Sequence, residues 1–155
     1  METVVNTRVI FSAVREQKAV DQIIITFDKT VTNIGNGMNP ESGVFTAPVS
    51  GIYSFSLSGS RFFKTSGAVY IDVLKNEEVE FTIIEQNYYF QITKTDQEGL
   101  NQSWMMSLAQ NDKVQMKLNL GLDLYFYSQI VVNFGGNSLY KTPLWFNGQL
   151  LDLTQ

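Results

Sequence analysis

The stretch Gly43–Leu57, GVFTAPVSGIYSFSL, decides the fold class of this 155-residue chain. In its second half large residues alternate with serines: Tyr53, Ser54, Phe55, Ser56 and Leu57. A period of two with one apolar side is typical of a β-strand that buries one face. Pro48 lacks an N–H and Gly51 allows a tight turn, so both suit a connection before that strand. The stretch predicts a short strand, a turn and a longer strand.

Similar patterns recur along the chain, separated by turn residues. Strands are predicted at Thr3–Val14, Gln22–Phe27, Gly43–Ala47, Tyr53–Ser58, Ala68–Leu74, Val79–Ile84, Ser103–Leu108, Val114–Leu120, Leu124–Phe134 and Pro143–Leu153. Asp28–Pro40, rich in Asn and Gly, is predicted to be turns, and Ser58–Ser66 and Glu85–Asn101 to be connections. We find no helical stripe, internal repeat or domain boundary. The sequence therefore predicts one all-β domain over residues 3–155, an antiparallel sandwich or jelly roll.

Composition limits the classes of partner. Hydrophobic residues make up 44% of the chain, enough for a core, whereas charged residues are only 17%. A surface with so few charges tends to be covered partly by other chains or by neutral polar groups. The net charge of −4 and the isoelectric point of about 4.7 argue against nucleic acid as a partner. No apolar run approaches the roughly 20 residues that span a bilayer, so membrane insertion is not expected.

The chain contains no cysteine and no histidine. It therefore has no disulfide, thiol nucleophile, imidazole base or cysteine- or histidine-ligated zinc site. Glu77, Glu78 and Glu80 share one predicted hairpin and leave carboxylate-pair catalysis as a remote alternative. We predict that the protein is not an enzyme and has no catalytic residue and no cofactor. The first residues, METVVNT, show no signal-peptide pattern, which leaves both a cytosolic chain and a processed secreted chain open.

Five segments together resemble the globular-head domain of complement C1q, a module related in fold to tumour necrosis factor (TNF). They are VIFSAVRE at Val9–Glu16, ITFDKTVTNIGNGMNPESGVFTAPVSGIYSFSLS at Ile25–Ser58, IDVLKNE at Ile71–Glu77, NQSWMMSLAQNDKVQMKL at Asn101–Leu118 and WFNGQLLDL at Trp145–Leu153. Two connections, Glu85–Leu100 and Asn119–Pro143, are longer than is usual in that family. The resemblance implies a ten-stranded jelly roll that assembles as a compact homotrimer. It also implies a secreted, extracellular location and a non-enzymatic recognition role.

A trimer interface is predicted on the second face of two strands. In Ala68–Leu74 one face is apolar, while the other carries Tyr70, Asp72 and Leu74; in Val114–Leu120 the second face carries Gln115 and Lys117. The resemblance places both strands near a threefold axis. We therefore expect these five residues at the interface, with an Asp72–Lys117 pair repeated around the ring. The alternative is that Tyr70 and Leu74 pack under a loop of their own chain.

A ligand surface is predicted at two aromatic groups, which contain Tyr88, Tyr89, Tyr125 and Tyr127. Exposed aromatic rings stack on sugars and anchor protein interfaces; alternatively, these rings brace loops. Glu85, Asp96 and Glu98 offer the oxygen ligands that calcium prefers, but without a loop-ligand spacing, so no metal site is assigned. Asn101-Gln102-Ser103 is a sequon for N-glycosylation, relevant only to a chain secreted by a eukaryote.

The first functional hypothesis is a secreted homotrimeric C1q-like module, innate-immune or lectin-like, that binds a microbial surface, a glycan or a receptor. Three copies of a weak site would give it avidity. The second is a TNF-like cytokine or adhesion ligand for a cell-surface receptor. The third is a structural trimerisation cap of a longer protein.

Overall fold

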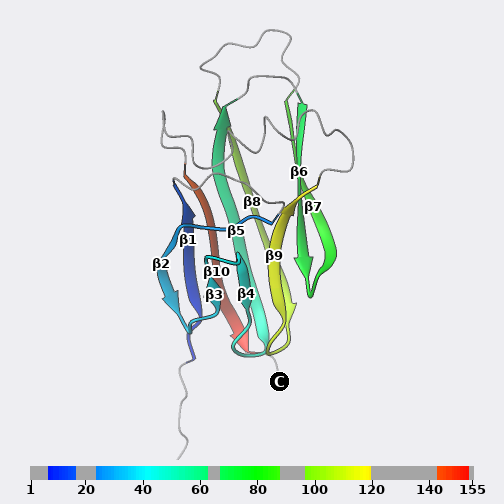
Figure 1. Ribbon diagram of the computed structural model, residues 1–155. Helices are drawn as coiled ribbons and strands as arrows, with labels where there is room; N and C mark the ends of the chain where they lie inside the picture. Colours follow the sequence, from blue (N-terminus) through cyan, green and yellow to red (C-terminus); the bar gives the residue numbers. More distant parts are fainter. Residues whose placement is uncertain (1–6, 17–23, 63–66, 88–96, 120–142, 154–155) are drawn as a thin grey trace, which may run out of the picture.

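The computed structural model describes residues 7–16, 24–62, 67–87, 97–119 and 143–153, which form ten strands in two five-stranded sheets (Figure 1). The strands are β1 (Ile10–Arg15), β2 (Lys29–Ile34), β3 (Met38–Asn39), β4 (Val44–Thr46), β5 (Gly51–Phe62), β6 (Gly67–Lys75), β7 (Glu78–Asn87), β8 (Gln97–Leu108), β9 (Lys113–Leu118) and β10 (Leu144–Leu153). The prediction of an all-β sandwich is confirmed.

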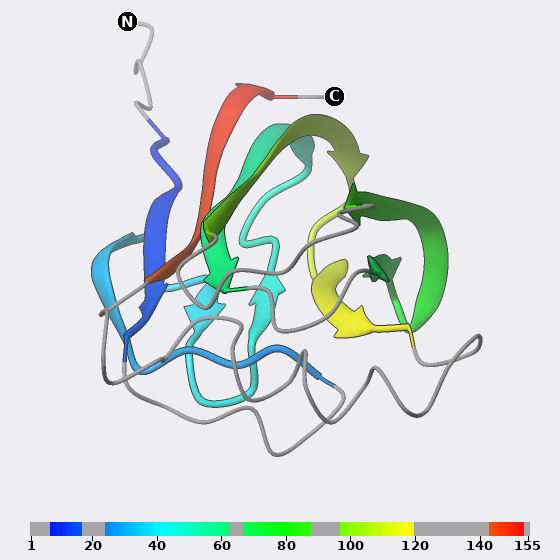
Figure 2. The same ribbon diagram turned by 90° about the horizontal axis from the view of Figure 1, so that it is seen from above.

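Every strand pair is antiparallel. Sheet A has the order β2-β1-β10-β5-β8, and sheet B has the order β3-β4-β9-β6-β7. In Figure 2, which looks down the strands, β1 and β10 run side by side on one side of the molecule, and β6, β7 and β9 gather on the other. The first and last strands are thus neighbours near the middle of sheet A.

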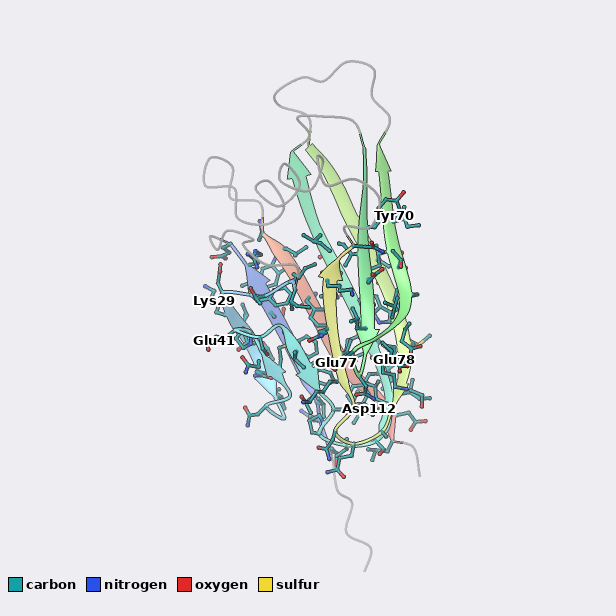
Figure 3. All side chains as sticks on the ribbon, turned by 45° about the vertical axis from the view of Figure 1, so that its right-hand side comes forward. Lys29, Glu41, Tyr70, Glu77, Glu78 and Asp112 are labelled. Carbon is teal, nitrogen blue, oxygen red and sulfur yellow. The ribbon has the colours of Figure 1, made fainter. Side chains whose placement is uncertain are left out.

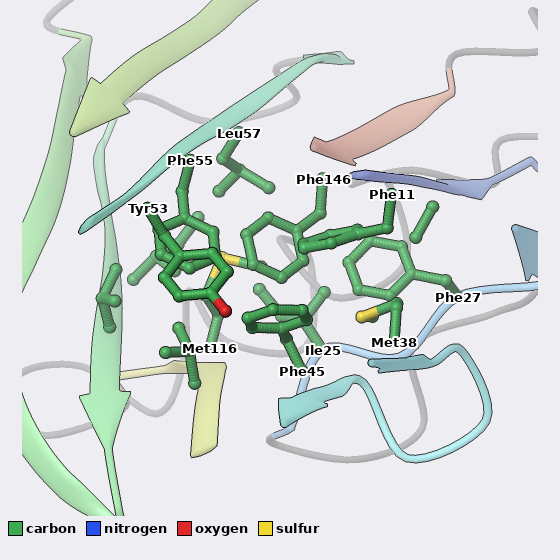
Figure 4. Packing of buried hydrophobic residues seen from close by; sticks show 14 of the residues in the cluster. Phe11, Ile25, Phe27, Met38, Phe45, Tyr53, Phe55, Leu57, Met116 and Phe146 are labelled. Carbon is green, nitrogen blue, oxygen red and sulfur yellow. The ribbon is translucent and has the colours of Figure 1, made fainter. Parts of the chain in front are cut away.

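The core between the sheets is a cluster of aromatic rings (Figure 4). The ring centroid of Phe11 lies 4.9 Å from that of Phe45 and 5.0 Å from that of Phe146. Tyr53 is also buried, and its hydroxyl donates a 2.6 Å hydrogen bond to the carbonyl oxygen of Val49. Burial raises the pKa of Tyr53, although this hydrogen bond opposes the rise. Stacked and edge-on rings of this kind add to the energy of their buried area.

Two predictions near the start of the chain were wrong. Ile24–Phe27 lies in no strand: Ile24 forms an isolated bridge, and the amides of Ile25 and Phe27 donate to Met116 and Pro40. A strand forms instead inside the predicted turn region, at β2. The side-chain amide of Asn33 bonds the backbone of Met38 in both directions, so the turn needs only the few residues between them.

The long β5–β8 ladder also exceeds its prediction. Its register runs from Gly51 opposite Leu108 to Phe62 opposite Gln97, so part of each predicted connection is strand. The predicted strand Leu124–Phe134 lies outside the described residues.

Candidate recognition surface

The outer side of sheet A carries a row of small polar side chains, one from each strand. The strand registers place these residues side by side: Thr32, Ser12, Asn147, Ser56 and Ser103. Because successive side chains of a strand point to opposite faces, the aromatic residues beside them, among them Phe11 and Phe55, point into the core. The same alternation that builds the core therefore builds this row.

Hydrogen bonds join the centre of this row. The Ser12 hydroxyl donates to Oδ1 of Asn147, and the Asn147 amide donates to the Ser56 hydroxyl at 3.3 Å. The chain of bonds runs across β1, β10 and β5. Part of the polar capacity of these groups is thus satisfied within the chain, which lowers the cost of covering them.

The adjacent row is apolar at both ends. Its residues in order are Ile34, Ile10, Gln149, Ser54 and Met105. Ile34 and Ile10 are 46% and 37% exposed at one end, and Met105 is 69% exposed at the other. We call these two rows together the serine face.

A shallow groove of about 600 Å³ runs over the serine face. Its lining consists of Ile10, Phe11, Ser12, Thr32, Ser54, Phe55, Ser56, Ser103, Trp104, Met105, Asn147, Gly148 and Gln149. None of these residues is charged. An antiparallel sheet that faces water usually shows polar side chains there, and a surface normally mixes in charges of both signs. A grooved and neutral sheet face is therefore suited to being covered.

The residues predicted at the trimer interface share one face of sheet B, as expected. Within a single chain Asp72 lies opposite Lys117, and Leu74 lies opposite Gln115. The Asp72 carboxylate accepts hydrogen bonds from the Thr82 hydroxyl at 2.6 Å and from the Asn119 amide at 3.3 Å.

The residues predicted at the trimer interface differ in how much of each is exposed in the single chain. Leu74 and Asp72 are only 3% and 4% exposed in the single chain. Their own chain therefore already covers them, whereas the prediction had a second copy cover this face. Tyr70 is half-buried opposite Ile84, which is 54% exposed. Figure 3 shows Tyr70 toward the opposite end of β6 from Glu77 and Glu78.

The other predicted sites are not placed by the structure. Tyr88, Tyr89, Tyr125, Tyr127 and Asp96 lie outside the described residues, and the side chains of Glu85 and Glu98 are likewise not described. Within the described ranges, no three acidic residues gather as a metal site would require. The described part of the chain also contains no helix with the length and apolar character needed to cross a membrane. Glu77, Glu78 and Glu80 are all exposed.

Sequence reasoning missed the serine face, although β5 carries a signal for it. Ser54, Ser56 and Ser58 alternate with the core residues of that strand, where a solvated face would carry some charge. Taken alone, the alternation in β5 identifies only the buried side of that strand. That the other strands of sheet A continue the uncharged row follows from their order in the sheet.

The sequence matches the family model of the C1q domain over residues 10–137. The chain therefore belongs to the C1q domain family, which confirms the resemblance. Among solved structures it is similar to the globular domain of zebrafish complement 1qA, with 18% identity, a TM-score of 0.66 and coverage of 94% of this chain and 99% of that one.

A second similar structure is murine APRIL, with 15% identity, a TM-score of 0.56 and coverage of 91% of this chain and 98% of that one. At these identities the two structures support the shared jelly-roll fold. Comparison with curated proteins gives no match.

Proposed function

We propose that the protein is a non-enzymatic, extracellular recognition module that works as a homotrimer and binds a microbial surface, a glycan or a receptor. The observation that carries the assembly is the neutral, grooved serine face. Membership of the C1q domain family supports the recognition role. The lack of histidine and cysteine in the chain supports a role without catalysis.

A second copy of this chain is the occupant that the serine face fits best. Moving a charged group out of water costs several kcal/mol per ion, and the lining of the serine face contains no charged group. The polar groups at its centre already form hydrogen bonds with one another. The apolar residues at the two ends of the face can bury one another if one end of each copy contacts the other end of the next copy. Met105 of one copy would pack on Ile10 and Ile34 of the next, a head-to-tail contact that closes into a ring when the rotation is threefold.

The predicted interface on sheet B stays a competing proposal. Tyr70 and Ile84 still have apolar surface to bury there, but Leu74 and Asp72 have almost none. The two faces belong to different sheets, so one substitution on each face distinguishes the two proposed interfaces.

The test is the mass in solution of two aspartate variants. On the serine face, Met105→Asp places a charge in the contact and should convert the trimer to a single chain. Tyr70→Asp should leave the trimer intact, and Val79→Asp, on the exposed β6–β7 hairpin, serves as a matched control. If Tyr70→Asp gives a single chain and Met105→Asp stays a trimer, the interface lies on sheet B. A wild-type protein with the mass of one chain refutes assembly.

The ligand class is tested on the assembled protein. Reproducible binding to a glycan array or to bacterial cells supports the surface-recognition role. Saturable binding to one membrane protein supports the TNF-like alternative, and binding to neither supports a structural cap. Alanine variants of Tyr88 and Tyr127 then show whether the predicted aromatic groups take part.

A further inference from the structure

The outer face of sheet B carries a buried carboxylate beside an aromatic ring and several polar side chains. We propose that this group binds a neutral sugar unit of a glycan. Its members are Tyr70, Asp72, Thr82, Lys117 and Asn119. The proposal rests on the function proposed above and narrows it to one class of ligand. A sandwich turns its two outer faces in opposite directions, so a trimer closed through the serine face leaves this face uncovered.

Three neighbouring strands bring the five residues together. Asp72 of β6 lies opposite Thr82 of β7 on one side and opposite Lys117 of β9 on the other. The backbone N–H of Asn119, directly after β9, donates a 2.9 Å hydrogen bond to the carbonyl oxygen of Tyr70. Residues next to them along each strand belong to the core, so all five side chains point to the outer side of the sheet.

The carboxylate of Asp72 is held through one oxygen only. The Thr82 hydroxyl and the Asn119 amide both donate to Oδ1, at 2.6 and 3.3 Å. Within the described residues Oδ2 accepts no hydrogen bond, and it is not sealed from solvent. In the same part of the chain no ion pair joins Asp72 to Lys117, although the two residues are direct neighbours. The carboxylate is therefore fixed in place and still has acceptor capacity for a ligand.

The residues around Asp72 are more exposed than Asp72 itself. Asp72 is 4% exposed, whereas Tyr70 and Lys117 are half-buried and Asn119 is exposed. Figure 3 shows Tyr70 at the right-hand border of the molecule. A ligand group that reaches Oδ2 therefore passes beside the Tyr70 ring and the Lys117 ammonium.

This combination of groups matches the chemistry of a pyranose. Sugar hydroxyls donate strongly to a carboxylate and accept from an ammonium group such as that of Lys117. The apolar side of the sugar ring stacks on an aromatic ring such as that of Tyr70. An acidic sugar would bring its own charge close to Asp72 and to the exposed Glu80, which lies two residues before Thr82. A neutral sugar is thus the class of ligand that uses the whole group.

The experiment applies the full chain to an array of immobilised neutral and acidic glycans. Calorimetry then measures the affinity for the strongest neutral hit, free in solution so that each site counts singly. Asp72→Asn should weaken binding about tenfold or more, because it removes a charged acceptor. Tyr70→Ala should weaken it about three- to tenfold, because it removes the stacking ring. Light scattering should give a trimer for wild type and for both variants.

The matched control is Glu41→Gln, which removes a carboxylate elsewhere on the surface. Glu41 is exposed, and Figure 3 shows it on the opposite side of the view from Tyr70. This variant should bind the glycan with the affinity of wild type, and its unfolding midpoint should match that of Tyr70→Ala. The comparison separates loss of the site from loss of a charge or of the fold.

Three results overturn the sugar site and leave the trimer and the recognition role in place. They are hits on acidic glycans alone, full affinity in both site variants, and saturable binding to a membrane protein without any glycan hit. Loss of the trimer in Asp72→Asn and Tyr70→Ala overturns the site together with the contact proposed on the serine face. If wild type is a single chain, the assembly is refuted, and the same affinities still decide the sugar site.

Discussion

Gly148 lies where two aromatic rings of the core leave no space for a side chain. A Cβ built there would be 2.7 Å from Cζ of Phe11 and 2.9 Å from Cδ1 of Phe55. Gly148→Ala should therefore lower the free energy of unfolding by about 1–3 kcal/mol, the usual cost of overpacking. Chemical denaturation measures it, with Ser54→Ala on the outer face as control. Equal stability of the two variants would mean that the rings move aside at no cost.

Glu77 holds the left-handed backbone conformation in the β6–β7 turn, with φ of 70°. A residue with a Cβ pays about 1–2 kcal/mol there, and glycine does not. After the larger backbone entropy of glycine is subtracted, Glu77→Gly should raise stability by about 0.5–1 kcal/mol. Glu78→Gly, one residue later in β7, should lower it. The midpoints of thermal unfolding of both variants provide the check, and a loss in both would reject the argument.

At the scale of elements, Asp112 ties together the turns at one end of the sandwich. Its Oδ1 accepts from the Asn76 amide at 3.0 Å, and its Oδ2 accepts from the Ala109 N–H at 2.8 Å. These two hydrogen bonds, with a smaller contribution from the charge of Lys75, lower the pKa of Asp112. The β6–β7 and β8–β9 turns are thus joined through a charged carboxylate.

The pH dependence of stability follows from this lowered pKa. A carboxyl with a lower pKa in the folded state stabilises the fold fully above its unfolded pKa of about 4, and the contribution is lost as the pH falls through the folded value. Wild type should therefore exceed Asp112→Asn in melting temperature at neutral pH, and the gap should shrink in acid. Melting curves across that range test this, and a constant gap would assign the effect to shape and not to charge.

Strands with one aromatic side could be predicted from sequence because burial imposes a period of two. β2 could not be predicted in this way, because its sequence KTVTNI is mostly polar and is followed directly by turn residues. The C-terminal part of β5 also lacks this alternation, because Gly59 and Ser60 follow one another there. These segments are strands because β1 and β8 pair with them, and pairing is not visible in a single segment.

The candidate site was harder to predict for the same reason. The sequence correctly placed Tyr70, Asp72 and Leu74 on one face, but burial depends on neighbouring strands. Thr82 and Asn119 bond Asp72 from either side. The serine face likewise exists only when five strands stand in the observed order.

At the scale of the whole molecule, assembly should show in the melting behaviour. A trimer that melts to unfolded single chains is stabilised by mass action, so its melting temperature rises with protein concentration. Wild type should show this rise and Met105→Asp should not. Calorimetry over a dilution series measures it. A melting temperature independent of concentration in wild type would indicate that folding and assembly are separate.

The pairing of β1 with β10 has a consequence for synthesis on the ribosome. The middle of sheet A cannot close until Leu144–Leu153 has left the exit tunnel, because β10 supplies the partner of both β1 and β5. Until then the nascent chain shows Phe11 and Phe55 without the ring of Phe146 between them. Chaperones that bind apolar segments therefore have the interval between the emergence of β1 and that of β10 in which to engage the nascent chain.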